Sequence, residues 1–423
     1  MRPIYKTPIY IFALLLLIAC GGGGSPGTAK QFSQEEKTFL YQLFHTEYLW
    51  YDQVKTESEH PYATALDMVR SLRVSPPDKW SFVMTKQEWD NYSKQKTQGF
   101  GFSYNQEYRI VVVLIDSPVY TKLQRGDVLL EIDGKPITQS AIRNASNQLD
   151  TPVTFKIRRG ANEQTVTVTP RIYTHKVTLS KIIPYQGKTV GYLRYDAFTH
   201  ASQTEIEEAF TQFHQNNIDE LVIDLRYNGG GSIATATVLL DNITNAYPGE
   251  RLIYLDWNDR YQAYNEDYNF AQSSQGHNEL SMDRVFFLTT KHSASASELV
   301  ISALKPYLGE SNIVTIGTNT HGKPVGMSGV TYGENYYFLI NFRVKNDAGI
   351  STSFDGIPAT CNATDGIDHL MGDPQEAMLA SALYYMVHNA CPSSMSQKTI
   401  AKQAVEKTIQ EVGSPLKIQG LFL

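Results

Sequence analysis

The sequence has few cysteines, no basic stripe and no apolar run long enough to span a membrane comfortably. Only three of the 423 residues are cysteine, and the formal net charge is -6. Without a cluster of basic residues the chain has no strongly positive region that would attract nucleic acid, so we expect no nucleic-acid partner. Hydrophobic residues make up 42% of the chain and charged residues 19%, as in an ordinary globular protein. The length predicts two or three domains.

The first twenty residues are typical of an export signal. Arg2 and Lys6 precede the apolar run 9–18, which is shorter than a transmembrane span. The run ends in L-I-A-C, which resembles a bacterial lipobox and implies that Cys20 is lipidated; an ordinary signal peptide ending in cysteine is the alternative. Residues 21–28 are glycine-rich and predict a flexible linker. We therefore expect a membrane partner through a lipid anchor in the bacterial cell envelope, at the outer membrane facing the periplasm.

The two remaining cysteines are Cys361 and Cys391. An exported chain with an even pair of cysteines can form a disulfide. Two buried free thiols are the alternative.

Residues 29–95 predict a small helical region. Ser33 and Glu36 have the spacing of a capping box at a helix start, and apolar residues follow at helical spacing. A second helix is expected over 63–69.

Residues 96–172 contain two stretches that together resemble a PDZ domain. The first is the turn G-F-G-F, formed by Gly99, Phe100, Gly101 and Phe102, and the second is R-G-D-V-L-L-E-I-D-G-K-P-I at 125–137. The resemblance implies a peptide-binding loop at 99–102, because a glycine turn exposes consecutive N–H groups and an open sheet edge accepts an added strand. The alternative is a degenerate domain that only packs or gates.

Residues 173–392 alternate between strand and helix patterns. The apolar run 221–225 predicts a strand buried on both faces, and it leads into R-Y-N-G-G-G-S and a helix. No P-loop lysine follows the glycines, so a nucleotide phosphate site is excluded. The glycine turn is better suited to donating backbone N–H groups to an oxyanion.

A serine-rich turn and a lysine turn follow two later apolar runs. K-H-S-A-S-A-S-E at 291–298 lies between the run 285–288 and a predicted helix. G-T-N-T-H-G-K-P at 317–324 follows the run 313–316. A serine and a lysine on neighbouring strand-end loops are sufficient for acyl transfer.

These motifs, in this order, resemble the carboxyl-terminal processing proteases of peptidase family S41. The resemblance implies an α/β fold with a crotonase-like (ClpP/enoyl-CoA hydratase-like) core and a preceding or inserted PDZ domain. It implies Ser295 as the nucleophile and Lys323 as the general base, with oxyanion donors from the N–H groups of Ala296 and Gly230. It also implies protein or peptide substrates with exposed C-termini, and neither a cofactor nor a metal.

The sequence departs from the family pattern in two places. Many members carry a glutamine four residues after the lysine, where this chain has Met327. The separation of Ser295 and Lys323 is also slightly long, which predicts extra residues in a surface loop near 306–311.

Two further segments are predicted less specifically. The tyrosine-rich segment 247–278 either borders the site or faces solvent, and the tail 393–423 is weakly helical over 400–412. A non-catalytic binding or scaffold protein on the same fold, which would bind a hydrophobic ligand or a peptide C-terminus, is the alternative function. The presence of both Ser295 and Lys323 favours the peptidase.

Overall fold

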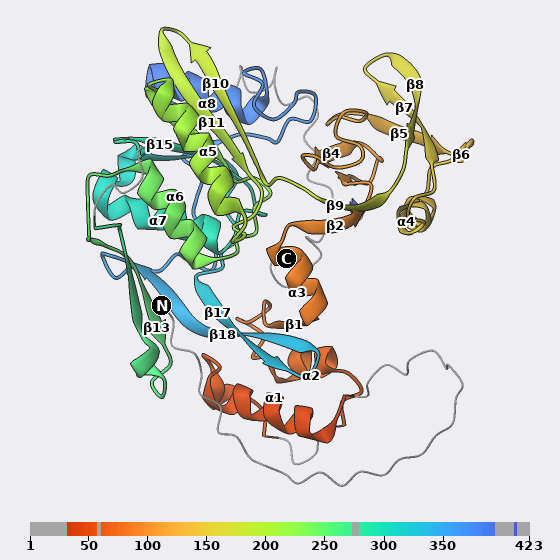
Figure 1. Cartoon of the computed structure of the whole chain (residues 1–423). Helices are drawn as coiled ribbons and strands as arrows, with labels where there is room; N and C mark the ends of the chain where they lie inside the picture. The colour runs from red at the N-terminus through yellow and green to blue at the C-terminus, as the bar shows by residue number, and fades with distance from the viewer. Residues whose placement is uncertain (1–31, 57–60, 273–278, 394–409, 413–423) are drawn as a thin grey trace, which may run out of the picture.

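The computed structural model describes residues 32–56, 61–272, 279–393 and 410–412. Figure 1 shows the chain as an α/β core, a smaller β-rich module beside it, and an N-terminal region below a second sheet. The predicted signal peptide, the lipidation residue Cys20 and the linker 21–28 lie outside the described residues. Within the described ranges, no helix combines the length and apolarity needed to cross a bilayer.

The N-terminal region contains more than the predicted helices. Its first helix begins as expected, with the Ser33 hydroxyl accepting a hydrogen bond from the Glu36 N–H at 3.2 Å. The region also contributes a strand that pairs antiparallel with β18 of the second sheet. The predicted helical region therefore also contains a strand, because the four-residue run Phe82–Thr85 pairs with a sheet edge that cannot be inferred from the local sequence. The elements are α1 (Gln34–Thr46), η1 (Tyr51–Gln53), α2 (Ala65–Leu72), β1 (Phe82–Thr85) and α3 (Lys86–Ser93).

The smaller module has its own hydrophobic core, which includes Phe100, Phe102 and Phe155. A strand from the end of the chain, β20 (Gln410–Val412), pairs antiparallel with β3. The module's elements are β2 (Lys96–Gly99), β3 (Phe102–Tyr104), β4 (Ile110–Val113), β5 (Val128–Ile132), β6 (Lys135–Pro136), α4 (Gln139–Asn147), β7 (Val153–Arg159), β8 (Asn162–Val168) and β9 (Arg171–Thr174).

The core is built on a six-stranded sheet in the order β10-β11-β12-β15-β16-β19. All pairs are parallel except β10 with β11. Leu221 and Ile223 face the cluster containing α5, α6 and α7, whereas Val222 faces α8, so the strand is buried on both faces as its apolar run predicts. The elements are β10 (Thr178–Tyr185), β11 (Lys188–Tyr195), α5 (Ser202–Gln215), β12 (Glu220–Asp224), α6 (Ile233–Ile243), β15 (Val285–Thr289), α7 (Ala296–Leu308), β16 (Ile313–Gly317), β19 (Cys361–Asn362) and α8 (Ala377–His388).

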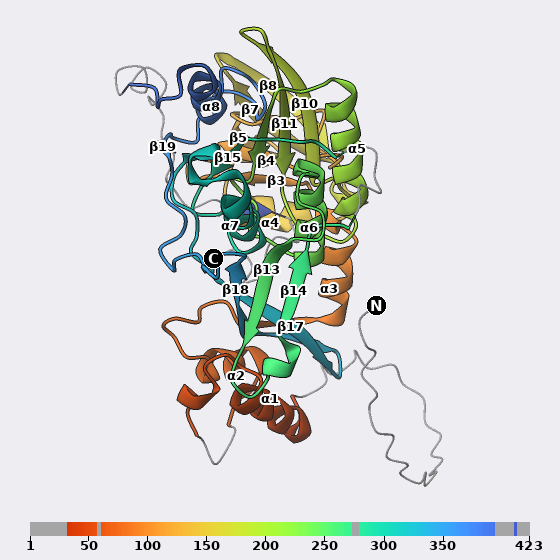
Figure 2. The same ribbon diagram turned by 90° about the vertical axis from the view of Figure 1, so that its left-hand side faces the viewer.

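A second sheet lies between the core and the N-terminal helices, as both views show (Figures 1 and 2). Its order is β1-β18-β13-β14, with β17 also paired to β18. The tyrosine-rich segment supplies the hairpin of β13 and β14 rather than an irregular insertion. The remaining elements are β13 (Arg251–Trp257), η2 (Gln262–Tyr264), β14 (Glu266–Asn269), β17 (Val325–Tyr332) and β18 (Asn335–Asn346).

Two local predictions are wrong. The expected surface loop near 306–311 is mostly helical, because α7 continues to Leu308 and the short helix η3 (Glu310–Asn312) follows Gly309. The described part of the tail, 410–412, is a strand and not a helix. Here β pairing with β3 outweighs a weak local helical preference. The rest of the predicted tail helix, 400–409, lies outside the described residues.

Candidate active site

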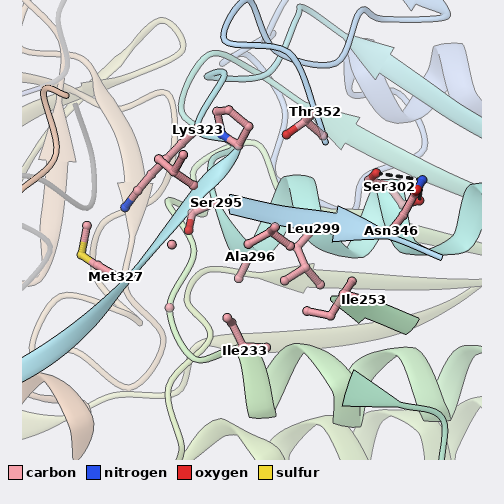
Figure 3. A pocket seen from close by; sticks show the side chains of 15 residues that line it. Ile233, Ile253, Ser295, Ala296, Leu299, Ser302, Lys323, Met327, Asn346 and Thr352 are labelled. Atoms are coloured by element: carbon pink, nitrogen blue, oxygen red, sulfur yellow. Dashed lines mark hydrogen bonds between the residues drawn. The ribbon is translucent and has the colours of Figure 1, made fainter. Parts of the chain in front are cut away.

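The parallel pairing of β15 and β16 brings the serine turn and the lysine turn to one edge of the core sheet. Val285 pairs with Ile313 and Thr289 with Gly317, so both strands end at the same level. Ser295 and Lys323 follow those ends and line one small cavity of about 70 Å³, which we call the Ser–Lys cavity (Figure 3).

Ser295 occupies an unusual backbone position. Its φ is 58° and its ψ is -113°, and it is the residue that immediately precedes α7. A non-glycine residue with this geometry is strained, and strain of this kind is common at functional turns. The turn presents the hydroxyl to the cavity beside the first N–H groups of the helix.

Glu298 joins the two turns. One carboxylate oxygen accepts from the N–H groups of Ser295 (2.9 Å) and Lys323 (2.8 Å). The other accepts from the Thr320 hydroxyl (2.6 Å) and the Gly322 N–H (2.7 Å). The side chain is fully buried. Sequence analysis gave Glu298 no role, although its place three residues after Ser295 has capping-box spacing that could have revealed it.

Lys323 is buried, with 3% of its surface exposed. Burial lowers the pKa of its ammonium to about 8, against the opposing influence of the carboxylates of Asp78 and Glu298. Among the hydrogen bonds of the described residues, none joins the Lys323 Nζ to the Ser295 Oγ or to another group.

The structure favours a different glycine as the oxyanion donor. The Gly230 N–H donates to Asn228 Oδ1 at 2.8 Å, so the predicted donor is already engaged. A Cβ on Gly230 would lie 2.8 Å from the Ser295 Cβ, which explains why glycine is required there. The N–H groups of Gly231 and Ala296 make no hydrogen bond within the described chain, and both residues line the Ser–Lys cavity.

The segment that carries these three loops is similar to known proteins. The sequence profile of peptidase family S41 matches residues 189–358, a range that includes both turns and the glycine loop. The match covers less than half of the chain, and we call residues 189–358 the S41 segment.

Two curated relatives of the S41 segment and its flanks are assigned as CtpA-like serine proteases. The Staphylococcus saprophyticus protein is 25% identical over 302 residues, covering 68% of this chain and 56% of the relative. The Staphylococcus aureus (strain COL) protein is 23% identical over 303 residues, covering 68% and 55%. The chain thus spans about half the length of the curated relatives it matches.

A crystal structure of a Bacteroides fragilis NCTC 9343 protein assigned to the S41 proteases has a similar fold. Its TM-score is 0.72 at 24% identity, over 83% of this chain and 97% of that one. The similarity shows the fold shared by the two chains.

The N-terminal region also reaches the lysine turn of the S41 segment. The Trp80 indole N–H donates to His321 Nε2 at 3.0 Å, and His321 Nδ1 lies 3.1 Å from the Lys291 carbonyl. Asp78 is buried and accepts from Trp80 N, Ser81 N, Ser81 Oγ and the Tyr48 hydroxyl. Sequence analysis missed Asp78 and Trp80, since nothing in the N-terminal pattern links them to a turn more than 200 residues away.

Met327, which stands where the resemblance implied a glutamine, lines the Ser–Lys cavity on β17. A thioether cannot orient an ammonium or amine as an amide can. No other described side chain hydrogen-bonds the Lys323 amine in its place. The pKa of Lys323 is thus set by its burial and by the two nearby carboxylates.

A buried ionic cluster lies behind the glycine loop. Arg226 is fully buried and pairs with Asp224 (2.8 Å), Glu376 (2.9 Å) and Asp365 (2.6 Å). Arg125 of the smaller module also pairs with Asp365 and donates to the Tyr227 hydroxyl at 2.9 Å. The cluster connects the smaller module to the residues just before Asn228.

The predicted peptide-binding loop lies apart from the Ser–Lys cavity. The Phe100 and Phe102 side chains are buried in the core of the smaller module, and Gly101 packs so closely that an added Cβ would lie 2.2 Å from the Ser117 Cβ. The backbone edge of β3 is paired with β20.

Cys361 and Cys391 form a disulfide that joins β19 to the end of α8, with their Cα atoms 5.5 Å apart. No group of three or more metal-ligating side chains is positioned to hold a metal ion in the described ranges.

Proposed function

We propose that this protein is a serine endopeptidase of the Ser–Lys dyad type. The observation that carries the proposal is a strained serine and a buried lysine with a lowered pKa in one cavity. Two partner-free N–H groups, those of Gly231 and Ala296, lie in the same cavity. The match of the S41 segment to the profile of peptidase family S41 supports the same reaction.

The first half of the reaction forms an acyl-enzyme. Neutral Lys323 takes the proton of the Ser295 hydroxyl as Ser295 Oγ bonds to the substrate carbonyl carbon. The resulting oxyanion accepts hydrogen bonds from the N–H groups of Ala296 and Gly231. When the C–N bond breaks, the Lys323 ammonium gives its proton to the departing amine.

The second half releases the acid. Neutral Lys323 takes a proton from water as the water oxygen bonds to the ester carbonyl carbon, and the same N–H groups hold the second oxyanion. The Ser295 C–O bond then breaks, and the Lys323 ammonium returns its proton to Ser295 Oγ. Both halves require the amine to swing into hydrogen-bond reach of Ser295, a motion for which the flexible lysine side chain is suited.

We infer that the substrates are exported proteins cleaved near their C-termini, and that the smaller module is a PDZ domain. The pairing of β20 with β3 supports this, because it shows an extended segment added to the edge that follows the G-F-G-F turn. We also assign the six-stranded sheet and its helices to a crotonase-like core.

The proposed location is the bacterial cell envelope, through a lipid on Cys20. Its support is the L-I-A-C motif after an apolar run. We expect labelled palmitate to be incorporated into the wild type and not into Cys20→Ala. Equal labelling of both proteins would rule out the lipid anchor.

The dyad is tested by Ser295→Ala and Lys323→Met. Each is expected to lower kcat/KM on an unfolded protein substrate by at least about 1,000-fold, because nucleophile and base act as a unit. Lys305→Met is the matched control, since Lys305 lies on α7 and pairs with Glu310 at 2.9 Å. Thermal unfolding of all three variants checks that the fold persists. Full activity in Ser295→Ala would overturn the dyad, whereas no cleavage by the wild type would favour the binding-protein alternative.

A further inference from the structure

A large cavity lined with aromatic side chains adjoins the Ser–Lys cavity. Its volume is about 900 Å³, and we call it the aromatic cavity. The two cavities share Gly231, Ile233 and Met327 as lining residues, so they lie next to each other. A chain bound across Ser295 would therefore pass close to the aromatic cavity.

Two walls of rings enclose this space. Trp89 stands 5.3 Å from Tyr336 and 5.0 Å from Phe338, centroid to centroid, on the wall made by α3 and β18. Trp257 and Tyr264 of the β13–β14 hairpin, whose ring centroids are 5.5 Å apart, form another part of the lining. Ring faces of this kind favour large apolar and aromatic side chains.

The charges of the lining argue against a free carboxylate as the occupant. Among the described residues that line the aromatic cavity, none is lysine or arginine, and the one carboxylate is Glu266. An anionic chain terminus would find no cation there. The occupant that fits is an internal stretch of polypeptide.

We propose that the aromatic cavity is a substrate subsite that takes a large apolar or aromatic side chain near the scissile bond. The assignment rests on the proposed peptidase function and names the class of sequence that this site selects.

The test uses the full chain and pairs of otherwise identical peptides with phenylalanine or alanine at successive positions around the cleaved bond. At one position or more, kcat/KM for the phenylalanine peptide is expected to exceed that for the alanine peptide by about tenfold. Tyr264→Ala should abolish this preference, chiefly through KM. Tyr120→Ala, an exposed tyrosine in the smaller module, is the matched control and should leave it intact.

Equal kcat/KM for phenylalanine and alanine at every position, or a preference unchanged in Tyr264→Ala, would overturn the subsite.

Binding to the Ser295→Ala protein distinguishes failure of the subsite from failure of the peptidase assignment. If the wild type cleaves nothing but Ser295→Ala binds the phenylalanine peptide more tightly, and Tyr264→Ala removes that difference, the subsite stands and the peptidase proposal falls. Binding of palmitate without binding of either peptide would overturn the subsite and favour a hydrophobic-ligand carrier.

Discussion

At the scale of single residues, the site depends on burial rather than on a dedicated partner for the base. Lys323 has a lowered pKa because it is removed from water, while Asp78 and Glu298 limit the shift. Glu298 also fixes the backbone of both turns through four hydrogen bonds. One buried carboxylate therefore influences both the geometry and the charge state of the dyad.

The activity is expected to rise with pH. The neutral amine is the active form, so kcat/KM should increase about tenfold per pH unit below a midpoint near 8 and level off above it. Because the pKa of Lys323 is lowered only in the folded chain, the unfolded chain binds more protons than the folded chain between about pH 8 and pH 10.5. The contribution of Lys323 to the free energy of unfolding therefore rises with pH over that range. A pH–rate profile on one peptide measures the midpoint, and a profile flat from pH 6 to 10 would contradict the role of Lys323.

Glu298→Gln is expected to change both stability and the pH profile. The amide keeps one acceptor oxygen, leaving two buried N–H groups unpaired at a cost of about 2–4 kcal/mol in unfolding free energy. Loss of the negative charge also removes an influence that raises the Lys323 pKa, so the acid limb should move to lower pH. Chemical denaturation and the pH–rate profile check the two effects. A variant that only loses stability would make Glu298 purely structural.

At the scale of elements, parallel pairing does most of the positioning. β12, β15 and β16 are adjacent, so the glycine loop, the serine turn and the lysine turn all follow strands that end at one edge. Helix α8 lies on the other face of the core sheet. Its start is fixed by Glu376, which pairs with Arg226, and its end is fixed by the disulfide.

Removing that disulfide should loosen α8. Cys361→Ser with Cys391→Ser is expected to lower the unfolding free energy by about 3 kcal/mol, as for a closed loop of about this length. Urea denaturation with and without reductant measures it. The wild type should lose stability in reductant and the double variant should not; equal wild-type stability in both conditions would contradict a structural role.

At the scale of the whole molecule, two other parts of the chain contact the S41 segment. The N-terminal region contributes Trp80 and Asp78, and the smaller module contacts Tyr227 through Arg125, just before the glycine loop. The end of the chain returns to the smaller module, where β20 pairs with β3 and also contacts α4.

If the edge of β3 receives substrate tails, the chain's own β20 competes for it. A tethered segment acts at an effective concentration of about millimolar. Truncation after Ser393 is therefore expected to tighten binding of a labelled peptide with a free apolar C-terminus by at least about tenfold, measured by fluorescence anisotropy. Glu411→Pro should act in the same direction, because proline disrupts strand pairing. Unchanged affinity in both variants would contradict competition.

The sequence by itself determined the strands buried on both faces, the helices after them and the two turns that carry Ser295 and Lys323. Apolar runs and small-residue turns are local signals, so these elements were predictable. Tertiary structure alone decided which glycine N–H is free, that Glu298 links the turns, that Phe82–Thr85 joins a sheet, and that Trp80 and the aromatic walls reach the site. Each of these depends on contacts between segments far apart in the chain, and a hydrogen bond or a cavity exists only once those segments have packed together.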